Sequence, residues 1–115
     1  MAKNYLLTYA EQLATDVELL CQNIIAPSNT LFRIRIGTGS VYDNIREANY
    51  GQSKADMLSK FEIALKECSE TEGWLQLMFN TQAINEEIFK SHRNLCGRIR
   101  RMLIASCKTL KENAK

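Results

Sequence analysis

The sequence has few of the residues from which metal and cofactor sites are built. It contains one histidine, His92, and four cysteines, at positions 21, 68, 96 and 107, with no CxxC pair. A zinc site or a disulfide scaffold needs more closely spaced ligands. His92 and Cys96 are four residues apart and could share a helix face, but no third ligand with suitable spacing is near. We therefore expect free buried thiols, no metal and no cofactor.

Long apolar runs are also missing. The longest stretch without a charged residue, 19–32, includes the only proline and is shorter than the ~20 apolar residues that a membrane-spanning helix needs. The N-terminal segment carries several acids, which is not typical of a signal peptide, so we expect a cytoplasmic protein. The chain has 115 residues, 45% of them hydrophobic and 24% charged, and we expect residues 1–115 to fold as one domain.

The spacing of apolar residues predicts four helices joined by short turns. The first covers about 6–24, the second about 31–48, the third about 53–80, and the fourth runs from 85 towards 113. The start of the second helix is ambiguous, because residues 31–36 alternate as in a strand. We favour helix there, since the heptad pattern continues through it and no partner strand exists. Short connections make neighbouring helices antiparallel, so we expect an all-α, up-down-up-down four-helix bundle.

Three turn residues fix the expected ends of these helices. Gly51 suits a left-handed helix C-terminus, and Ser53 followed by Asp56 resembles a capping box. Asn85, with two glutamates directly after it, is a good N-cap for the fourth helix.

The third predicted helix has more apolar surface than one core needs. On a helical wheel its apolar arc runs from Leu58 through Phe61 to Trp74, Leu77 and Ile63, more than half of the circumference. Burial on one side needs an arc of roughly 100° or somewhat more. A fully central helix or a few tolerated exposed residues would explain the excess. We favour an interface between subunits at Ile63, Trp74 and Leu77, since a monomer of this size rarely leaves such residues together in water.

One carboxylate, Glu72, falls within that apolar arc, where a charge without partners is costly. On the second helix Ser40, Asn44 and Glu47 are spaced 4 and 3 and share one face. A buried polar network between the second and third helices would satisfy these groups and fix the helix register. The alternative is a catalytic carboxylate pair, but no His, Ser or Lys base stands beside it, so we expect no catalytic residue.

The fourth helix is basic although the net charge of the chain is only +2. From Asn85 onward there are eight bases and three acids, and the wheel places all the bases except Lys115, which lies beyond the helix, opposite Ile88, Leu95 and Ile99. A solvated face that pairs with acids is the plain explanation. The functional one is a phosphate-binding surface, acting by shape and charge because no aromatic residue lies among the bases. The residues expected to bind nucleic acid are Arg93, Arg98, Arg100, Arg101, Lys108 and Lys111.

Three stretches together resemble one bacterial family. They are residues 35–48, with the pattern Ser-x-x-x-Asn-Ile-x-Glu-Ala at 40–48, residues 50–56, and residues 64–75, which begin Ala-Leu-Lys-Glu. The chain resembles the four-helix bundle proteins encoded by intervening sequences inside large-subunit ribosomal RNA genes. That family includes the accessory variability protein of diversity-generating retroelements.

The resemblance implies a cylinder-like pentamer without enzymatic activity and, in the retroelement branch, a basic surface that binds nucleic acid and the polymerase. The family's blocks match the expected polar network at five positions, which are Ser40, Asn44, Glu47, Glu67 and Glu72. We therefore expect a non-enzymatic homo-oligomer whose fourth helix binds RNA or DNA without sequence preference, or binds a nucleic-acid enzyme such as a reverse transcriptase. The alternative is a purely structural assembly protein whose basic face pairs with acidic helices of neighbouring subunits.

Overall fold

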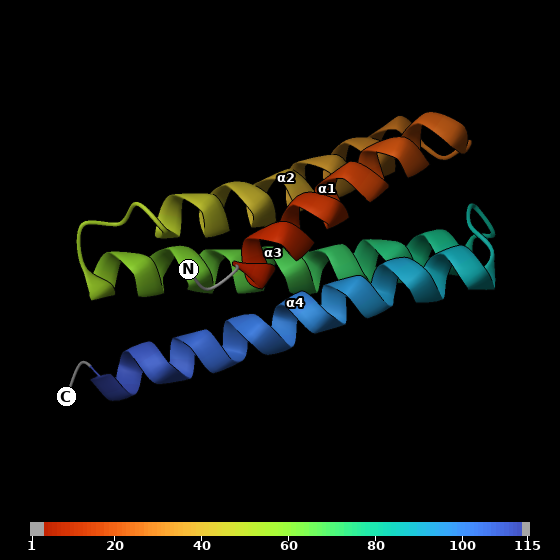
Figure 1. Ribbon diagram of the computed structural model, residues 1–115. Coiled ribbons are helices and arrows are strands. Elements are labelled where there is room, and N and C mark those ends of the chain that lie inside the picture. The colour runs from red at the N-terminus through yellow and green to blue at the C-terminus, as the bar shows by residue number, and fades with distance from the viewer. Residues whose placement is uncertain (1–3, 114–115) are drawn as a thin grey trace.

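The computed structural model describes residues 4–113, which form four helices. These are α1 (Tyr5–Asn23), α2 (Ser28–Ala48), α3 (Lys54–Asn80) and α4 (Glu86–Asn113) (Figure 1). No strand occurs within residues 4–113, and the ambiguous segment 31–36 is helical. The all-α prediction is therefore confirmed.

Side-chain caps start three of the helices. The Asn4 side chain accepts a hydrogen bond from the Leu7 amide, the Ser53 hydroxyl from the Asp56 amide, and the Asn85 side chain from the Ile88 amide. Each satisfies one backbone donor of a first turn. The N-caps predicted at Ser53 and Asn85 are confirmed.

The end of α2 differs from the prediction. Within residues 4–113 no glycine has a positive φ, so the left-handed conformation expected at Gly51 is wrong. The chain leaves α2 instead through tight right-handed turns, in which the amides of Tyr50 and Gly51 donate to the carbonyls of Glu47 and Ala48. A positive φ of 65° occurs at Gln82, in the turn between α3 and α4.

Contacts between neighbouring helices establish that they run antiparallel. Along α1 and α2, Glu11 accepts a hydrogen bond from Tyr42 and Glu18 pairs with Arg35, so one helix ascends as the other descends. The same order holds for α3 and α4, where Glu62 pairs with Lys111 and Glu72 with Arg100. Helices α2 and α3 meet at the pair Glu47–Lys60 near the turn that joins them.

The four helices form a ring in which α3 packs against α2 and α4, and α1 closes the ring against the same two helices. The core between them contains Leu13, Val41, Leu75 and Ile99, all fully buried. Helices α2 and α3 approach closely at Gly37, where a Cβ atom would lie 3.1 Å from the Thr71 hydroxyl oxygen. None of the helices within residues 4–113 is long and apolar enough to cross a membrane.

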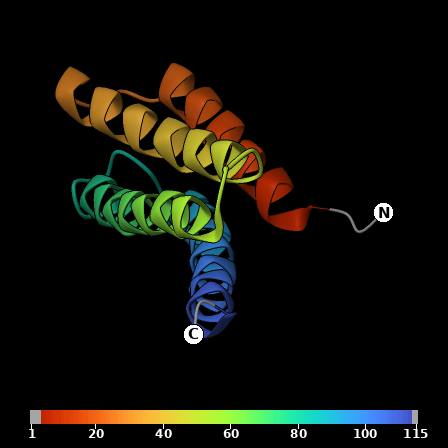
Figure 2. The same ribbon diagram turned by 90° about the vertical axis from the view of Figure 1, so that its left-hand side faces the viewer.

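The bundle is elongated, with extents of 47 × 25 × 20 Å, and its two ends differ. Helix α1 has 19 residues and α4 has 28, so α1 lies over the N-terminal part of α4 (Figure 1). Figure 2 shows the N-terminal end of α1 and the C-terminal end of α4 diverging from each other. The hollows along residues 104–112 of α4 are accordingly lined by residues of α3 and α4 alone.

Candidate nucleic-acid interface

The six bases expected to bind nucleic acid lie on the outer side of α4. Arg93, Arg98, Arg101, Lys108 and Lys111 are exposed and Arg100 is half-buried. The buried side of the helix is formed by Phe89, Cys96, Ile99, Leu103 and Cys107. Arg93, Arg100 and Lys111 each follow one of these residues by four positions and so flank the buried side, whereas Arg98 and Arg101 point farther from it. The 19 residues from 93 to 111 extend over about 27 Å of helix, at about 1.5 Å per step. Lys115 lies outside the described residues.

Aromatic rings hold two of these arginines in place. The Arg93 guanidinium lies 4.9 Å from the ring centre of Phe89, which is itself stacked on Phe79 at 4.6 Å. The Arg98 guanidinium lies 5.0 Å from the ring centre of Tyr9, on α1. Cation–π contacts of this kind restrict long side chains that would otherwise move freely. The contact between Arg98 and Tyr9 could not be predicted from local spacing, because Tyr9 reaches α4 only in the folded bundle.

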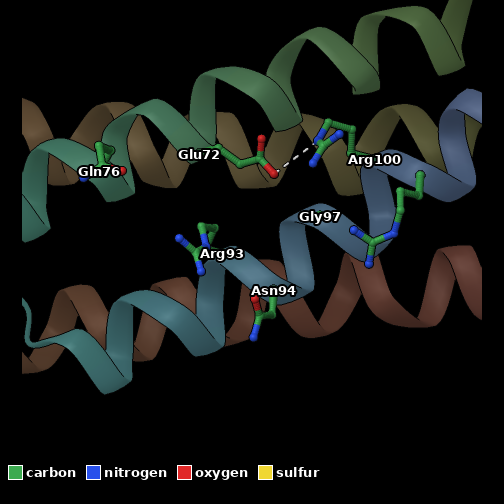
Figure 3. A pocket seen from close by; sticks show the side chains of 7 residues that line it. Glu72, Gln76, Arg93, Asn94, Gly97 and Arg100 are labelled. Atoms are coloured by element: carbon green, nitrogen blue, oxygen red, sulfur yellow. Dashed lines mark hydrogen bonds and ion pairs between the residues drawn. The ribbon is translucent and has the colours of Figure 1, made fainter.

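A pocket of about 310 Å³ opens between α3 and α4. Across it, Glu72 and Gln76 of α3 face Arg93 and Arg100 of α4, with Gly97 between them (Figure 3). The Nε of Arg100 donates to Oε1 of Glu72 at 3.3 Å. The complete lining is Glu72, Gln76, Arg93, Asn94, Gly97, Arg100 and Arg101.

A second hollow of about 300 Å³ lies on the other side of α4, against α1. Its lining includes Tyr9, Gln12 and Arg98, and it shares Asn94 and Arg101 with the first pocket. The two residues in common therefore stand on a ridge between two basic hollows. This arrangement makes the arginine-rich part of α4 one continuous surface, which we call the arginine face (residues 93–101).

The lysine end of the helix has different surroundings. Lys108 and Lys111 border a groove of about 360 Å³ whose lining includes the apolar residues Leu65 and Ile104, and Ile104 is 48% exposed. Lys111 pairs loosely with Glu62 at 3.6 Å, and both side chains are more than half exposed. Exposed pairs of this kind add little stability. The six bases are therefore not equivalent, and the arginines have the more defined positions.

Acidic residues of the chain leave most of the arginine face without a partner. Two acids of α1 face α2 instead, because Glu11 accepts a hydrogen bond from Tyr42 and Glu18 pairs with Arg35. The third, Asp16, lies near His92 of α4 and, in the described part of the chain, forms no ion pair with the arginines. Among residues 4–113 no carboxylate forms an ion pair with Arg93, Arg98 or Arg101. Pairing within the bundle thus does not neutralise this surface.

The residues expected at a subunit interface differ in exposure. Ile63 is 43% exposed and Leu77 is 51% exposed, whereas Trp74 is half-buried against the core. With 100° per residue the three lie within about 60° of one another on α3. On α2, Phe32 and Ile36 are also exposed, at 61% and 55%, and are one helical turn apart. This exposed apolar surface was not predicted from the sequence, because residues 31–36 alternate as in a strand.

The structure does not bring the five predicted network residues together. The Asn44 side chain donates to the carbonyl and the hydroxyl of Ser40, and Glu47 pairs with Lys60. Glu72 lies on the other side of α3, with Arg100 of α4.

The remaining member of that group, Glu67, lies beside α2 on the same side of α3 as Trp74. One of its carboxylate oxygens is 3.9 Å from where a Cβ of Gly37 would be. Burial, with a smaller contribution from the neighbouring Glu70, raises the pKa of Glu67 above its usual value, and Lys66 lowers it less. No cation lies within ion-pair distance of Glu67 in residues 4–113, so this carboxylate is less well compensated than Glu72.

The thiols and the histidine lie apart from the arginine face. All four cysteines are free and buried. Burial raises the pKa of Cys21 and of Cys107, and the contact with the Cys68 thiol, together with burial, raises that of Cys96. Thiols in this state are weak nucleophiles. A ring nitrogen of His92 is 2.8 Å from the Ile88 carbonyl oxygen, next to α1 rather than among other ligands.

Two comparisons with known proteins found similar chains. Residues 8–105 match the family model described as 23S rRNA-intervening sequence protein. The structure is similar to the crystal structure of a protein with unknown function from the S23 ribosomal protein family of Bacteroides thetaiotaomicron VPI-5482. The TM-score is 0.84 at 32% sequence identity, covering 90% of this chain and 98% of that chain. No curated protein matches the chain.

Proposed function

The chain belongs to the 23S rRNA-intervening sequence protein family, and from this premise we propose that it is a non-catalytic bundle that binds nucleic acid through the arginine face of α4. The observation that carries the proposal is the set of exposed arginines at 93, 98 and 101, which have no carboxylate partner within residues 4–113 and line two adjoining hollows. Arginine binds phosphate through paired hydrogen bonds, which lysine cannot reproduce.

The expected mode of recognition follows from the chemistry of this surface. The aromatic rings near it, Phe89 and Tyr9, lie beneath arginines and are occupied by them. They offer no free platform for base stacking, so contacts go to the phosphate backbone. Binding is then independent of base sequence and strongly dependent on salt.

Self-association forms the second part of the proposal. The exposed Ile63 and Leu77 on α3, with Phe32 and Ile36 on α2, give the bundle apolar surface beyond its own core. An oligomer, for which the family resemblance suggests five subunits, would cover that surface and present several arginine faces to one long nucleic acid. Several weak contacts on one ligand raise the overall affinity without any new contact.

The test is a binding titration with long RNA and long DNA at several salt concentrations. With about four phosphate contacts per subunit, the affinity of each subunit should fall by roughly 50- to 150-fold between 50 and 200 mM salt. Reversing Arg93, Arg98 and Arg101 to Glu should abolish binding while leaving the circular-dichroism spectrum unchanged, because all three are exposed and none forms an ion pair within residues 4–113.

The matched control reverses Arg33, Arg46 and Lys54 to Glu, which gives the same net charge but alters α2 and the start of α3. This control should bind RNA and DNA much more tightly than the α4 variant does. If both variants lose binding equally, net charge and not the arginine face is responsible. If the unaltered protein binds neither RNA nor DNA even at low salt, the basic face is a structural surface. The proposed nucleic-acid binding is then replaced by the alternative, a purely structural assembly protein.

A further inference from the structure

A glycine in the middle of α4 shapes the pocket between α3 and α4. A Cβ added to Gly97 would lie 3.2 Å from Nη1 of Arg101, 3.8 Å from Nη2 of Arg100 and 4.0 Å from Oε1 of Glu72. Residues three and four positions later share a helix face with Gly97, so both arginines fold back over it. Glycine weakens a helix interior by about 1 kcal/mol relative to alanine. Here it leaves room for two guanidinium groups and a ligand.

The groups around the pocket have a defined charge. Arg93, Arg100 and Arg101 contribute three positive charges and Glu72 contributes one negative charge, which leaves a net charge of +2. Gln76 and Asn94 add neutral side chains that can donate hydrogen bonds. Because Glu72 occupies the Nε of Arg100, it fixes this guanidinium while leaving its terminal nitrogens for another acceptor.

We propose that this pocket binds a single phosphate monoester, namely the phosphorylated end of a nucleic-acid strand. The inference rests on the proposed nucleic-acid function and makes its substrate more specific. A phosphate monoester carries a charge of about −1.5 to −2 at neutral pH and presents three acceptor oxygens, which matches the charge and the donors of the pocket. An internal phosphodiester carries one charge and would leave part of the arginine charge uncompensated.

The rest of the strand has a path across α4. Asn94 and Arg101 border both the pocket and the hollow against α1, and that hollow contains Arg98. A strand whose end is held beside Gly97 would cross this ridge and place its following phosphates near Arg98. The two hollows thus have separate tasks: the pocket recognises the end, and the α1 side binds the backbone.

The experiment compares oligonucleotides of one sequence that differ only at their ends. One carries a 5′-phosphate, one a 3′-phosphate and one has hydroxyl groups at both ends, with affinities measured by fluorescence anisotropy at one salt concentration. An end phosphate that gains one or more charge-assisted hydrogen bonds should bind about tenfold tighter or better. Equal affinities for all three oligonucleotides would overturn the inference but leave salt-dependent binding, and therefore the proposed function, intact.

Variants of the glycine link the preference to the pocket. Gly97→Leu fills the space without changing the charge and should remove the preference for a phosphorylated end. Gly39→Leu is the control, since a Cβ at Gly39 would meet nothing within 4 Å and this residue lies on α2. A preference that survives Gly97→Leu would contradict the assignment to this pocket.

Two arginine variants keep the test valid if Gly97→Leu does not fold. Arg93 and Arg98 are both exposed and both lie on aromatic rings, but Arg93 lines only the pocket and Arg98 only the α1 side. Arg93→Gln should reduce the preference for a phosphorylated end. Arg98→Gln should lower the affinity for all three oligonucleotides by the same factor. The opposite pattern would overturn the division of tasks.

Adenosine monophosphate and inorganic phosphate, each tested alone, identify the source of the phosphate group. If the mononucleotide binds and Gly97→Leu abolishes this while no oligonucleotide binds, the pocket takes a small phosphate monoester, and both the assignment to a strand end and the proposed nucleic-acid function fail. If neither small ligand binds, and an end phosphate does not raise the affinity of any oligonucleotide, the inference fails.

Discussion

Each of two sides of α3 carries a glutamate, but the two glutamates have different surroundings. On the side towards α4, Glu72 pairs with Arg100 and borders a pocket of polar and positively charged groups. On the outer side next to α2, Glu67 has no cation within ion-pair distance in residues 4–113 and lies close on the wheel to Ile63 and Trp74. A carboxylate that lines an anion site needs a compensating arginine, whereas one among apolar residues has a raised pKa.

This difference separates the two proposed tasks of the protein. The α4 side offers arginines to phosphate groups, and the outer side of α3 offers apolar surface to another subunit. Separate surfaces let one subunit assemble and bind nucleic acid simultaneously. Substitutions on the α4 side should then leave assembly unchanged. Substitutions on the outer side of α3 should leave the affinity of a single subunit unchanged, although the gain from several linked subunits is lost when the oligomer dissociates.

The largest effect is expected for Trp74→Ala on assembly. Large aromatic residues at interfaces commonly contribute 2 kcal/mol or more, so the dissociation constant of the oligomer should rise by about 30-fold or more. Sedimentation velocity over a range of concentrations would measure it. Leu77→Gln is a useful companion, because Leu77 is 51% exposed and its replacement should weaken assembly without disturbing the core. A stable monomer at micromolar concentration for the unaltered protein would remove the assembly proposal.

A pair of glycine variants should change stability in opposite directions by about 1 kcal/mol each. In Gly37→Ala the new Cβ meets the hydroxyl of fully buried Thr71 at 3.1 Å, so overpacking outweighs the gain in helix propensity. In Gly97→Ala the contact is the mobile end of Arg101, which can move aside, and the propensity gain remains. Thermal unfolding should show a lower midpoint for the first and a higher one for the second. Equal shifts in the unfolding midpoint would mean that both positions accommodate an added methyl group equally well.

The sequence predicts the helices well but not how their sides meet. Apolar periodicity and the caps at Ser53 and Asn85 place all four helices, because these signals are local. The polar group of α2 and α3 divides in the structure because a helical wheel does not reveal which neighbour Glu72 faces. The pocket at Gly97 was missed for the same reason: it forms only when α3 places Glu72 beside the arginines of α4.

A smaller effect is expected for Glu67→Gln and appears in the pH dependence of stability. Because the folded-state pKa of Glu67 is raised, the folded chain binds more protons than the unfolded chain between the ordinary Glu pKa and the raised value. Stability therefore falls as the pH rises through this window and stays lower at neutral pH. Glu67→Gln removes that loss, so its unfolding midpoint should exceed that of the parent at pH 7 and approach it in acid. A variant that is less stable at pH 7 would show that the carboxylate has a favourable partner.

The claim that phosphate is bound on the α4 side, away from the outer side of α3, can be tested directly by NMR. The Nε–Hε signals of the arginines would be followed while unlabelled RNA is added at low salt, with the indole N–H of Trp74, the only tryptophan, as an internal reference. The account predicts that the signals of Arg93, Arg98 and Arg101 shift while the Trp74 signal stays in place. A shift at Trp74 with unchanged arginine signals would contradict it.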